Sequence, residues 1–353
     1  MLKVVPYEDS DAQAWDYYVF SHPEGTCYHL TEWKRAVEKA YGHKSYYLIA
    51  RNVSVGGTPY QEEIVGILPF FHLNHLIFGN TLVSLPFCDY GGVLSDSEKV
   101  HAYLLRESIS LAEKLNNAKI EFRNAKRAAF GGLNTSFHKV RMVLKLNGNS
   151  DALWKSFEPK LRSQIRKPHK EGLDSITGGL ELLDDFYKVF SFNMRDLGSP
   201  VHSKALVRAV LEEFAGLSRI QVVYKKGMPV SSGLIICFRD TVFITWASSI
   251  RKFNPLSPNM MLYWNFLKHA ADAGYQKFDF GRSTPHEGSY KFKEQWGAKP
   301  SPLYWQQWQE NGSREASGVD LKRSYQRFVS LWKKFPIPVA NMVGPLIRKN
   351  ISL

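Results

Sequence analysis

The spacing of apolar residues along the chain predicts an alternation of helices and strands. After Thr31, for example, Trp33, Ala36, Val37 and Ala40 recur at the spacing of one helix face. Shorter apolar runs between turn residues predict strands. In the first half these patterns predict helices at 11–22 and 30–41, strands at 45–50, 63–72 and 80–85, a helix at 95–115 and a strand at 118–123.

The second half repeats this order of elements. Its patterns predict helices at 151–171, 180–197 and 203–214, strands at 219–225, 230–238 and 241–247, a helix at 258–273 and a strand at 277–280. We therefore expect two similar α/β units in tandem, each a mixed sheet flanked by helices. One continuous α/β domain with a large sheet is the alternative.

A turn-rich polar string at 147–151, Asn-Gly-Asn-Ser-Asp, separates the two halves. It predicts a first domain over 1–148 and a second over 149–312, with a basic tail over 313–353.

Composition and charge narrow the class of protein. The chain has 353 residues, of which 44% are hydrophobic and 22% charged, and this composition excludes a disordered protein. Lys and Arg number 46 against 33 Asp and Glu, so the net charge is +13. Such an excess calls for an anionic partner, which could be nucleic acid, a membrane surface or a phosphate-bearing substrate.

Several kinds of chemistry have no support in the sequence. Cys27, Cys88 and Cys237 are too few and too far apart for a disulfide framework or a four-ligand zinc site. Walker, GxSxG, HExxH and paired CxxC motifs are absent, so we expect no metal and no nucleotide hydrolysis. No apolar run reaches the roughly 18 to 20 residues that span a bilayer, and the start lacks a signal-peptide pattern. The expected location is the cytoplasm.

The densest basic stretch runs from Lys155 to Lys170, where six Lys and Arg face one acid, Glu158. Arg162 and Arg166 are four residues apart and would share a helix face. Their guanidinium groups match the oxygens of a phosphate, which makes this face a candidate anion site. A solvated helix face is the alternative. The candidate residues are Lys160, Arg162, Arg166 and Lys167.

Another candidate site follows the strand that begins at 277. Asp279 and Arg282 would lie at the carboxyl edge of a sheet, where open α/β folds form their clefts. They could equally pair with each other as a structural clamp. Lys291 and Lys293 are two residues apart, so only one of them would point into the cleft if the segment is helical. Lys293, near Phe292 and Trp296, is suited to stabilise an oxyanion.

Asp89 is the only carboxylate in the run from Leu85 to Gly92. It is either a turn-capping residue or a buried acid with a shifted pKa. Its neighbour Cys88 has no histidine at a recognisable spacing, and a small buried residue is the simpler interpretation.

The tail from 320 to 353 contains seven basic residues and one acid, Asp320. Leu321, Tyr325, Phe328, Val329 and Trp332 recur there at helical spacing. This pattern is typical of a helix that lies on an anionic leaflet. Packing of the apolar stripe on the second domain is the alternative.

These motifs together resemble the Fem-type peptidoglycan aminoacyltransferases. The resemblance rests on Trp154 with the stretch from Lys160 to Lys167, on Gly288–Lys293, and on Asp89-Tyr90 after Pro86. Two further stretches, 193–200 and 278–284, are similar to the FemAB-related branch associated with exopolysaccharide and PEP-CTERM loci.

The resemblance implies a tandem pair of GNAT, or acyl-CoA N-acyltransferase, folds. It also implies transfer of an acyl or aminoacyl group to an amine of a phosphate-bearing or lipid-linked saccharide precursor. Asp89 would orient or deprotonate the amine, and Lys293 would stabilise the oxyanion, with Asp279 as a third catalytic candidate. The residues implied to bind substrate are Tyr90, Lys160, Arg162, Arg166, Lys167, Arg282 and Lys291.

The donor stays open among aminoacyl-tRNA, acyl-CoA and an acyl carrier protein, each as a co-substrate with no permanently bound cofactor. The chain lacks the long heptad insertion of some Fem proteins, which argues against tRNA. The segment 246–255 lacks the Arg/Gln-x-x-Gly-x-Gly/Ala loop that grips coenzyme A in ordinary GNAT enzymes.

The sequence therefore predicts an acyltransferase that acts on a peptidoglycan or exopolysaccharide precursor, with peripheral contact to the inner membrane face. A non-catalytic scaffold that binds anions or a membrane surface is the main alternative. A stand-alone RNA binder is a third, but no groove-reading or single-strand motif supports it.

Overall fold

A computed structural model describes residues 1–352 apart from 54–61, 76–78, 117–118, 127–129 and 311–325. The described residues divide into two compact units, treated separately below. The first contains described residues within 1–140, 302–314 and 350–353, and the second those within 141–301 and 315–349. The predicted ranges make each domain a continuous stretch, whereas the compact units are interleaved along the chain.

The first unit combines helices with two groups of paired strands. One sheet has the order β1 (Leu2–Pro6), β3 (Leu48–Val53), β4 (Glu62–Leu68), β7 (Leu94–Ser95). The other has the order β2 (Lys44–Ser45), β5 (Phe71–His75), β6 (Gly79–Val83), β8 (Lys119–Asn124), β17 (Tyr304–Gln309), β9 (Asn134–Ser136). Its helices include α1 (Ala12–Ser21), α2 (Thr31–Tyr41), α3 (Glu98–Lys114) and 3-10 turns at Asp9–Asp11 and Cys27–His29.

Helix α3 is central to the first unit because it links two parallel strands, β6 and β8. Its apolar face, with Leu104 and Leu105, joins a core cluster that includes Phe70 and Phe122 from the strands. The side chain of Ser97 caps the helix by accepting a hydrogen bond from the backbone N–H of Val100 at 3.3 Å. The start of α3 is therefore fixed beside the ends of the strands.

Strand β17 explains why the first unit is discontinuous. It lies between the two sequence ranges of the second unit and pairs antiparallel with β8, with Tyr304 opposite Asn124. The side chain of Asn124 donates a hydrogen bond to the Gln306 side chain at 3.0 Å. Because this pairing joins residues far apart in the sequence, local patterns give no sign of it.

Among the described residues, the second unit has one sheet of seven strands, which is flanked by helices. The order is β11 (Leu173–Gly178), β12 (Ser218–Lys225), β13 (Met228–Phe238), β14 (Thr241–Ser249), β15 (Lys277–Ser283), β10 (Val140–Lys145), β16 (Lys299–Pro302). The helices include α4 (Ser150–Ser156), α5 (Pro159–Lys170), α6 (Leu183–Leu197), α7 (Lys204–Glu213), α8 (Pro258–Asp272), α9 (Gly288–Glu294) and α11 (Ile337–Arg348), with 3-10 turns at Leu180–Leu182 and Arg251–Leu256.

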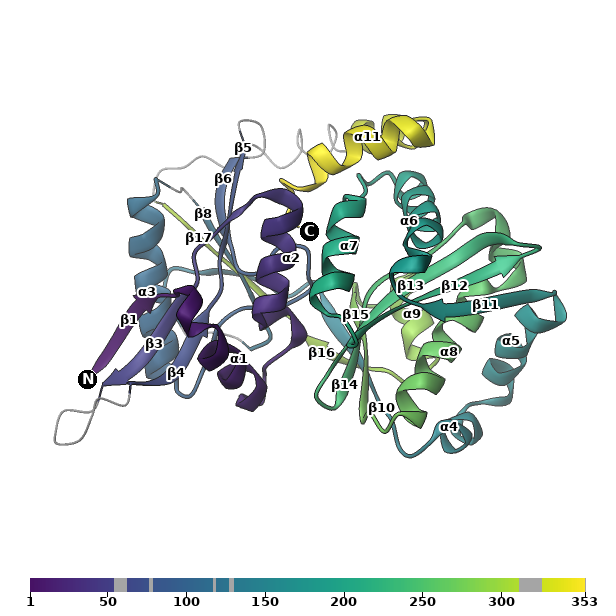
Figure 1. The fold of residues 1–353 in the computed structure, drawn as a ribbon, viewed down its shortest axis with the longest axis horizontal. Coiled ribbons are helices and arrows are strands. Elements are labelled where there is room, and N and C mark those ends of the chain that lie inside the picture. Colours follow the sequence, from purple (N-terminus) through teal and green to yellow (C-terminus); the bar gives the residue numbers. More distant parts are fainter. Residues whose placement is uncertain (54–61, 76–78, 117–118, 127–129, 311–325, 353) are drawn as a thin grey trace. The chain divides into compact units, whose positions relative to one another are not determined.

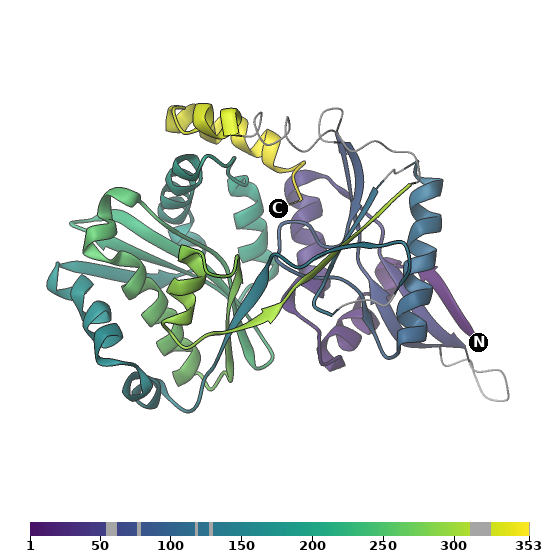
Figure 2. The ribbon, with the colours of Figure 1, turned by 180° about the vertical axis from the view of Figure 1, so that it is seen from behind.

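Helices cover both faces of this sheet. Helices α6 and α7 lie on one face, and α8 with α4, α5 and α9 lies on the other (Figures 1 and 2). Both α6 and α8 contact strands β12, β13 and β14. Strand β13 is accordingly buried at every position after Met228.

Two predicted elements are each broken by a proline. The predicted helix 151–171 is two helices, because Pro159 starts α5 and the preceding Glu158 is extended, with ψ 145°. The predicted strand 63–72 is divided into β4 and β5 around Pro69, which lacks the N–H needed for a sheet ladder.

The described part of the tail packs on the second unit. Trp332 is buried and its ring stacks on that of Phe328, with centroids 5.4 Å apart. The Arg195 side chain of α6 donates a hydrogen bond to the backbone oxygen of Phe335 at 2.9 Å. Packing on the protein itself, one of the two predicted alternatives, thus holds for this segment. The predicted tail positions Asp320, Leu321, Lys322, Arg323 and Tyr325 lie outside the described residues.

No helix in the described ranges is both long and apolar enough to cross a bilayer.

Candidate active site

Two parallel strands of the second unit separate from each other at their carboxyl ends. Strands β14 and β15 pair from Thr241 with Lys277 to Phe243 with Asp279, where the described pairing ends. The register between β13 and β14 shifts at Thr245, a bulge that bends β14. Helix α8 connects the two strands. Such diverging ends are the usual place for a ligand cleft in α/β folds.

A pocket of about 360 Å³ lies beside this carboxyl end of β14. Its lining comes from β14, from α8 and the 3-10 turn before it, from α6 and from α9. Most of the lining residues have polar side chains, and the full lining consists of Asn193, Ala247, Ser248, Ser249, Arg251, Asn254, Asn259, Tyr263, Ser289, Phe292 and Lys293.

Lys293 provides a buried positive charge in this lining. Its side chain is 7% exposed, and its Nζ donates hydrogen bonds to the backbone oxygens of Gly281 at 3.2 Å and Arg282 at 2.6 Å. These bonds tie α9 to the end of β15 and fix the cation at the pocket. Lys291, on the same helix, is exposed. The segment is therefore helical, and of its two lysines Lys293 lines the pocket while Lys291 does not.

A hydrogen-bond network orders the polar wall of the pocket. The Asn193 side chain of α6 donates to Ser248 Oγ at 3.1 Å. Ser231 Oγ lies 2.9 Å from the backbone oxygen of Ser248 and 3.0 Å from Asn259 Oδ1. The side chains of Asn193 and Asn259 are thereby oriented by the protein itself, which favours recognition of a polar ligand.

Tyr263 of α8 adds a phenol to the lining. Its ring meets that of Phe292 edge to face with centroids 5.0 Å apart. Burial raises the pKa of Tyr263 above its usual value. The phenol is therefore neutral at physiological pH and can donate a hydrogen bond.

Asp279 and Arg282 lie next to the pocket without lining it. The Asp279 carboxylate is buried and accepts a hydrogen bond from Arg141 Nε of β10 at 2.6 Å, and another from the backbone N–H of Gly281 at 2.8 Å. These bonds join β15 to the neighbouring strand β10. Arg282 contributes its backbone oxygen to Lys293.

The predicted basic cluster lies on α5, away from the pocket lining. Leu161 and Ile165 bury one face of this helix, while Lys160, Arg166 and Lys167 are exposed and Arg162 is half-buried. The Arg166 guanidinium lies 5.1 Å from the Trp154 ring of α4. The structure thus presents these cations as a basic surface of the second unit, separate from the Lys293 pocket.

The predicted residues Asp89 and Tyr90 belong to the first unit. Asp89 is half-buried, and its backbone oxygen accepts a hydrogen bond from Trp305 Nε1 at 3.2 Å. Tyr90 is buried against Tyr28 in an edge-to-face contact, with ring centroids 6.3 Å apart. Cys88 is buried as well, in agreement with its interpretation as a small packed residue.

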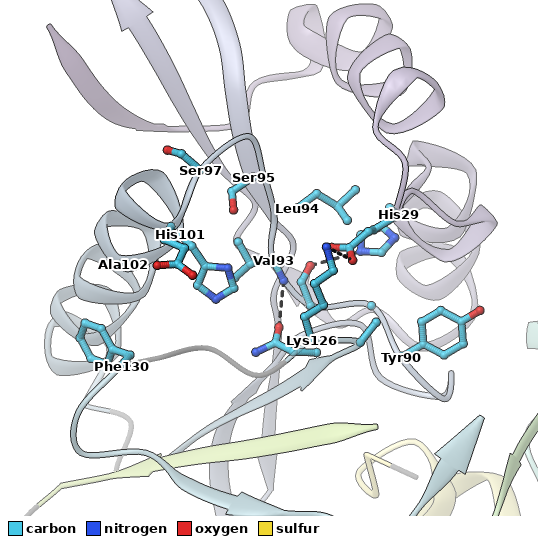
Figure 3. A pocket seen from close by; sticks show the side chains of 16 residues that line it. His29, Tyr90, Val93, Leu94, Ser95, Ser97, His101, Ala102, Lys126 and Phe130 are labelled. Carbon is cyan, nitrogen blue, oxygen red and sulfur yellow. Dashed lines mark hydrogen bonds and ion pairs between the residues drawn. The ribbon is translucent and has the colours of Figure 1, made fainter. Parts of the chain in front are cut away.

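A pocket of about 240 Å³ lies in the first unit, at the start of α3 (Figure 3). The side chain of Asn124 accepts a hydrogen bond from the backbone N–H of Val93 at 3.1 Å. His29 is fixed by Thr26 Oγ1 at 2.8 Å and by the backbone oxygen of Gly92 at 3.2 Å. Burial lowers the pKa of His29 to about 3, so the imidazole is neutral.

Sequence reasoning found Lys293 but missed most of the residues around it. Ser248 and Ser249 end a buried strand, and small polar side chains at that position are the one local signal that marks this wall. Asn193 and Asn259 lie on helices distant in the sequence, so no local pattern links them. Within the described chain, no group of three or more His, Cys, Asp or Glu is arranged to hold a metal ion.

The sequence of the second unit matches a known family. A family described as an acetyltransferase (GNAT) domain matches residues 155–294, a range that includes β14, α8, β15 and α9. No curated protein matches the sequence.

Similar solved structures cover both units. FemX has a TM-score of 0.66 at 15% identity, covering 93% of this chain and 100% of that one. A tandem GNAT protein from the clavulanic acid biosynthesis pathway has a TM-score of 0.54 at 11% identity, covering 89% and 100%. The C-terminal domain of a putative lysylphosphatidylglycerol synthetase from Agrobacterium fabrum has a TM-score of 0.53 at 11% identity, covering 90% and 94%. The chain therefore has a tandem GNAT fold, as its sequence motifs implied.

Proposed function

We propose that the protein is an N-acyltransferase or aminoacyltransferase that modifies an amine of a cell-envelope precursor. The observation that carries the proposal is the pocket at the diverging ends of β14 and β15, with the buried cation of Lys293 in its wall. The matched acetyltransferase domain contains both strands and the helix that bears Lys293. One structural relative is named as a putative lysylphosphatidylglycerol synthetase, which supports a cell-envelope acceptor.

The residues of the pocket suit acyl transfer from an ester or thioester. A neutral amine attacks the carbonyl carbon, a C–N bond forms, and the carbonyl oxygen takes the electron pair. The fixed charge of Lys293 stabilises this oxyanion. When the intermediate collapses, the acyl C–O or C–S bond breaks, and the donor alcohol or thiol leaves with the proton that the attacking nitrogen gives up. The neutral phenol of Tyr263 hydrogen-bonds to this leaving group.

The basic surface of α5 recruits the acceptor through its phosphate groups. Arg162 and Arg166 offer planar guanidinium groups that match phosphate oxygens, and Lys160 and Lys167 add to the local potential. A phosphate-bearing or lipid-linked saccharide, as in peptidoglycan or exopolysaccharide precursors, has this chemistry. The roles implied for Asp89 and Tyr90 at the acceptor amine stay predictions.

The donor is proposed to be a co-substrate from one of three classes: acyl-CoA, aminoacyl-tRNA or an acyl carrier protein. In place of the glycine-rich loop of ordinary GNAT enzymes, the segment Arg251–Leu256 forms a 3-10 turn. It is followed by Ser257 at φ 58°, a left-handed conformation that is unusual outside glycine. The backbone contacts that bind the donor must therefore differ from those that the glycine-rich loop makes.

The test is a transfer assay with one donor of each class and an amine-bearing nucleotide-linked or lipid-linked saccharide as acceptor. We expect amide product by mass spectrometry with one donor class, and loss of product in Lys293→Met. If none of the donors yields product with any acceptor, the proposal fails.

The scaffold function is a second candidate, because the cations of α5 are exposed on the surface. It predicts binding to a polyanion such as heparin that weakens steeply with salt and is unchanged by donor or acceptor.

A further inference from the structure

Helix α11 has two apolar faces, and only one of them is covered. Ala340, Gly344 and Arg348, spaced four residues apart, are buried against the second unit. Met342 and Leu346 lie on the opposite side of the helix and are 70% and 62% exposed. A helix that is apolar all round is ordinarily buried all round. The outer face of α11 therefore calls for something to cover it.

The buried face holds α11 in a fixed rotation about its own axis. Arg348 Nε donates a hydrogen bond to His202 Nε2 at 3.1 Å, and both side chains are buried. Burial, together with the nearby Arg348 charge, lowers the pKa of His202 well below its usual value, so the ring is a neutral acceptor. A side chain at Gly344 would meet the backbone nitrogen of Val201 at 3.1 Å. Because these contacts fix the inner face, Met342 and Leu346 point outward.

The segment just before α11 also exposes an apolar side chain and several cations. Leu331, in the segment before α11, is exposed, as are Arg327, Lys333 and Lys334. From 326 to 349 the sequence contains no acidic residue. An apolar stripe accompanied by cations alone fits an anionic lipid surface, where apolar side chains enter the headgroup region and cations meet lipid phosphates.

We propose that the outer face of α11, defined by Val339, Met342 and Leu346, docks on an anionic membrane surface together with the exposed residues Arg327, Leu331, Lys333 and Lys334 of the preceding segment. Helix α11 has 12 residues and is about 18 Å long, too short to span the roughly 30 Å hydrocarbon core. It therefore lies along the interface. A second copy of the chain would bring like charges together, and a nucleic acid would leave the apolar stripe without a partner.

The test is co-sedimentation of the full chain with vesicles of equimolar phosphatidylglycerol and phosphatidylcholine, and with vesicles of phosphatidylcholine alone. We expect at least tenfold tighter binding to the anionic vesicles. Met342→Asp combined with Leu346→Asp weakens that binding at least tenfold. Lys333→Gln combined with Lys334→Gln weakens it about fivefold for each lysine and reduces its dependence on salt.

Met228→Asp is the matched control, because this methionine is also exposed, at 42%, but lies at the start of β13 in the same unit. It should bind the anionic vesicles within twofold of the unaltered chain. Circular dichroism melts should be the same for all variants, since the replaced side chains are exposed.

Two results would overturn the proposal. One is anionic vesicle binding that is absent or unaffected by the α11 substitutions. The other is a dimer in light scattering that dissociates in the Met342→Asp, Leu346→Asp variant, which would make a second copy the occupant. Vesicle binding needs no turnover, so its failure is distinguishable from failure of the proposed acyl transfer.

Discussion

Each unit has a buried cation near the carboxyl end of the second of two parallel strands, and the two cations act differently. Each has two parallel strands joined by a helix, β6–α3–β8 in the first unit and β14–α8–β15 in the second. In the second unit the strand ends diverge beside a pocket. In the first, backbone groups bridge them, with Ser84 N–H donating to Glu121 O at 2.9 Å and Gly91 N–H to Arg123 O at 3.0 Å.

Arg123, the residue before the last of β8, does not line the first-unit pocket, which lies beside Asn124 at the end of the same strand. Its side chain is 0% exposed and donates to the backbone oxygen of Cys88 at 2.8 Å and to Glu121 Oε1 at 2.8 and 3.0 Å. Burial alone would raise the pKa of Glu121, but the charge and hydrogen bonds of Arg123 outweigh it and hold the pKa below its usual value. A buried cation therefore marks a site only where it faces a cavity, as Lys293 does.

The largest expected effect is on the stability of the first unit. Arg123→Met leaves the Glu121 carboxylate buried without its partner and should lower the free energy of unfolding by about 3–5 kcal/mol. Urea denaturation, with hydrogen exchange to assign the loss to the first unit, is the measurement. Arg106→Met on the exposed side of α3 is the control and should change stability by under about 0.5 kcal/mol. Equal effects of the two substitutions would contradict a structural role for Arg123.

The corresponding change in the second unit should affect turnover instead. Lys293→Met keeps an unbranched side chain, one atom shorter, but removes the charge that faces the pocket. We expect kcat/KM for acyl transfer to fall ~100- to 1,000-fold. Lys291→Met, on the exposed side of the same helix, should retain nearly full activity. Full turnover in Lys293→Met would show that its charge does not act on the reaction.

Acid should destabilise the first unit through His29. Its pKa of about 3 in the folded protein lies below the ordinary value of 6.5, so the unfolded chain takes up a proton first as the pH falls. Stability is then lost from about pH 6.5 down to about pH 3, by about 1.4 kcal/mol per pH unit. Hydrogen exchange of first-unit peptides at pH 7 and 5 measures this loss. His29→Gln should flatten the dependence, and an unchanged slope would assign it to other groups.

The smallest expected effect concerns the basic surface of α5. Arg162→Ala combined with Arg166→Ala should raise KM for a phosphate-bearing acceptor about tenfold and leave kcat unchanged, since the two cations bind without touching the reacting atoms. Steady-state kinetics measure this, with Lys170→Ala at the exposed end of the helix as control. A fall in kcat at constant KM would place these cations elsewhere in the mechanism.

Local sequence patterns predicted most of the helices, though not α11, and many of the strands, and identified Lys293 through its aromatic neighbours. They could not show that Arg123 is buried, because its partners Glu121 and Cys88 are brought together by the tertiary fold. Strand β17 escaped prediction for the same reason, since it pairs with a strand of the first unit. The polar wall of the pocket combines residues of three elements. Only the serines at the end of β14 form a local sequence pattern that indicates a site.

We propose that the acyl donor binds at the diverging strands of the second unit. Hydrogen exchange of the full chain, with and without the donor that supports turnover, tests this most directly. The expected result is protection of residues 247–249 and 288–293, with little change at 91–95 and 124–126. Protection confined to the first-unit segments would contradict the account.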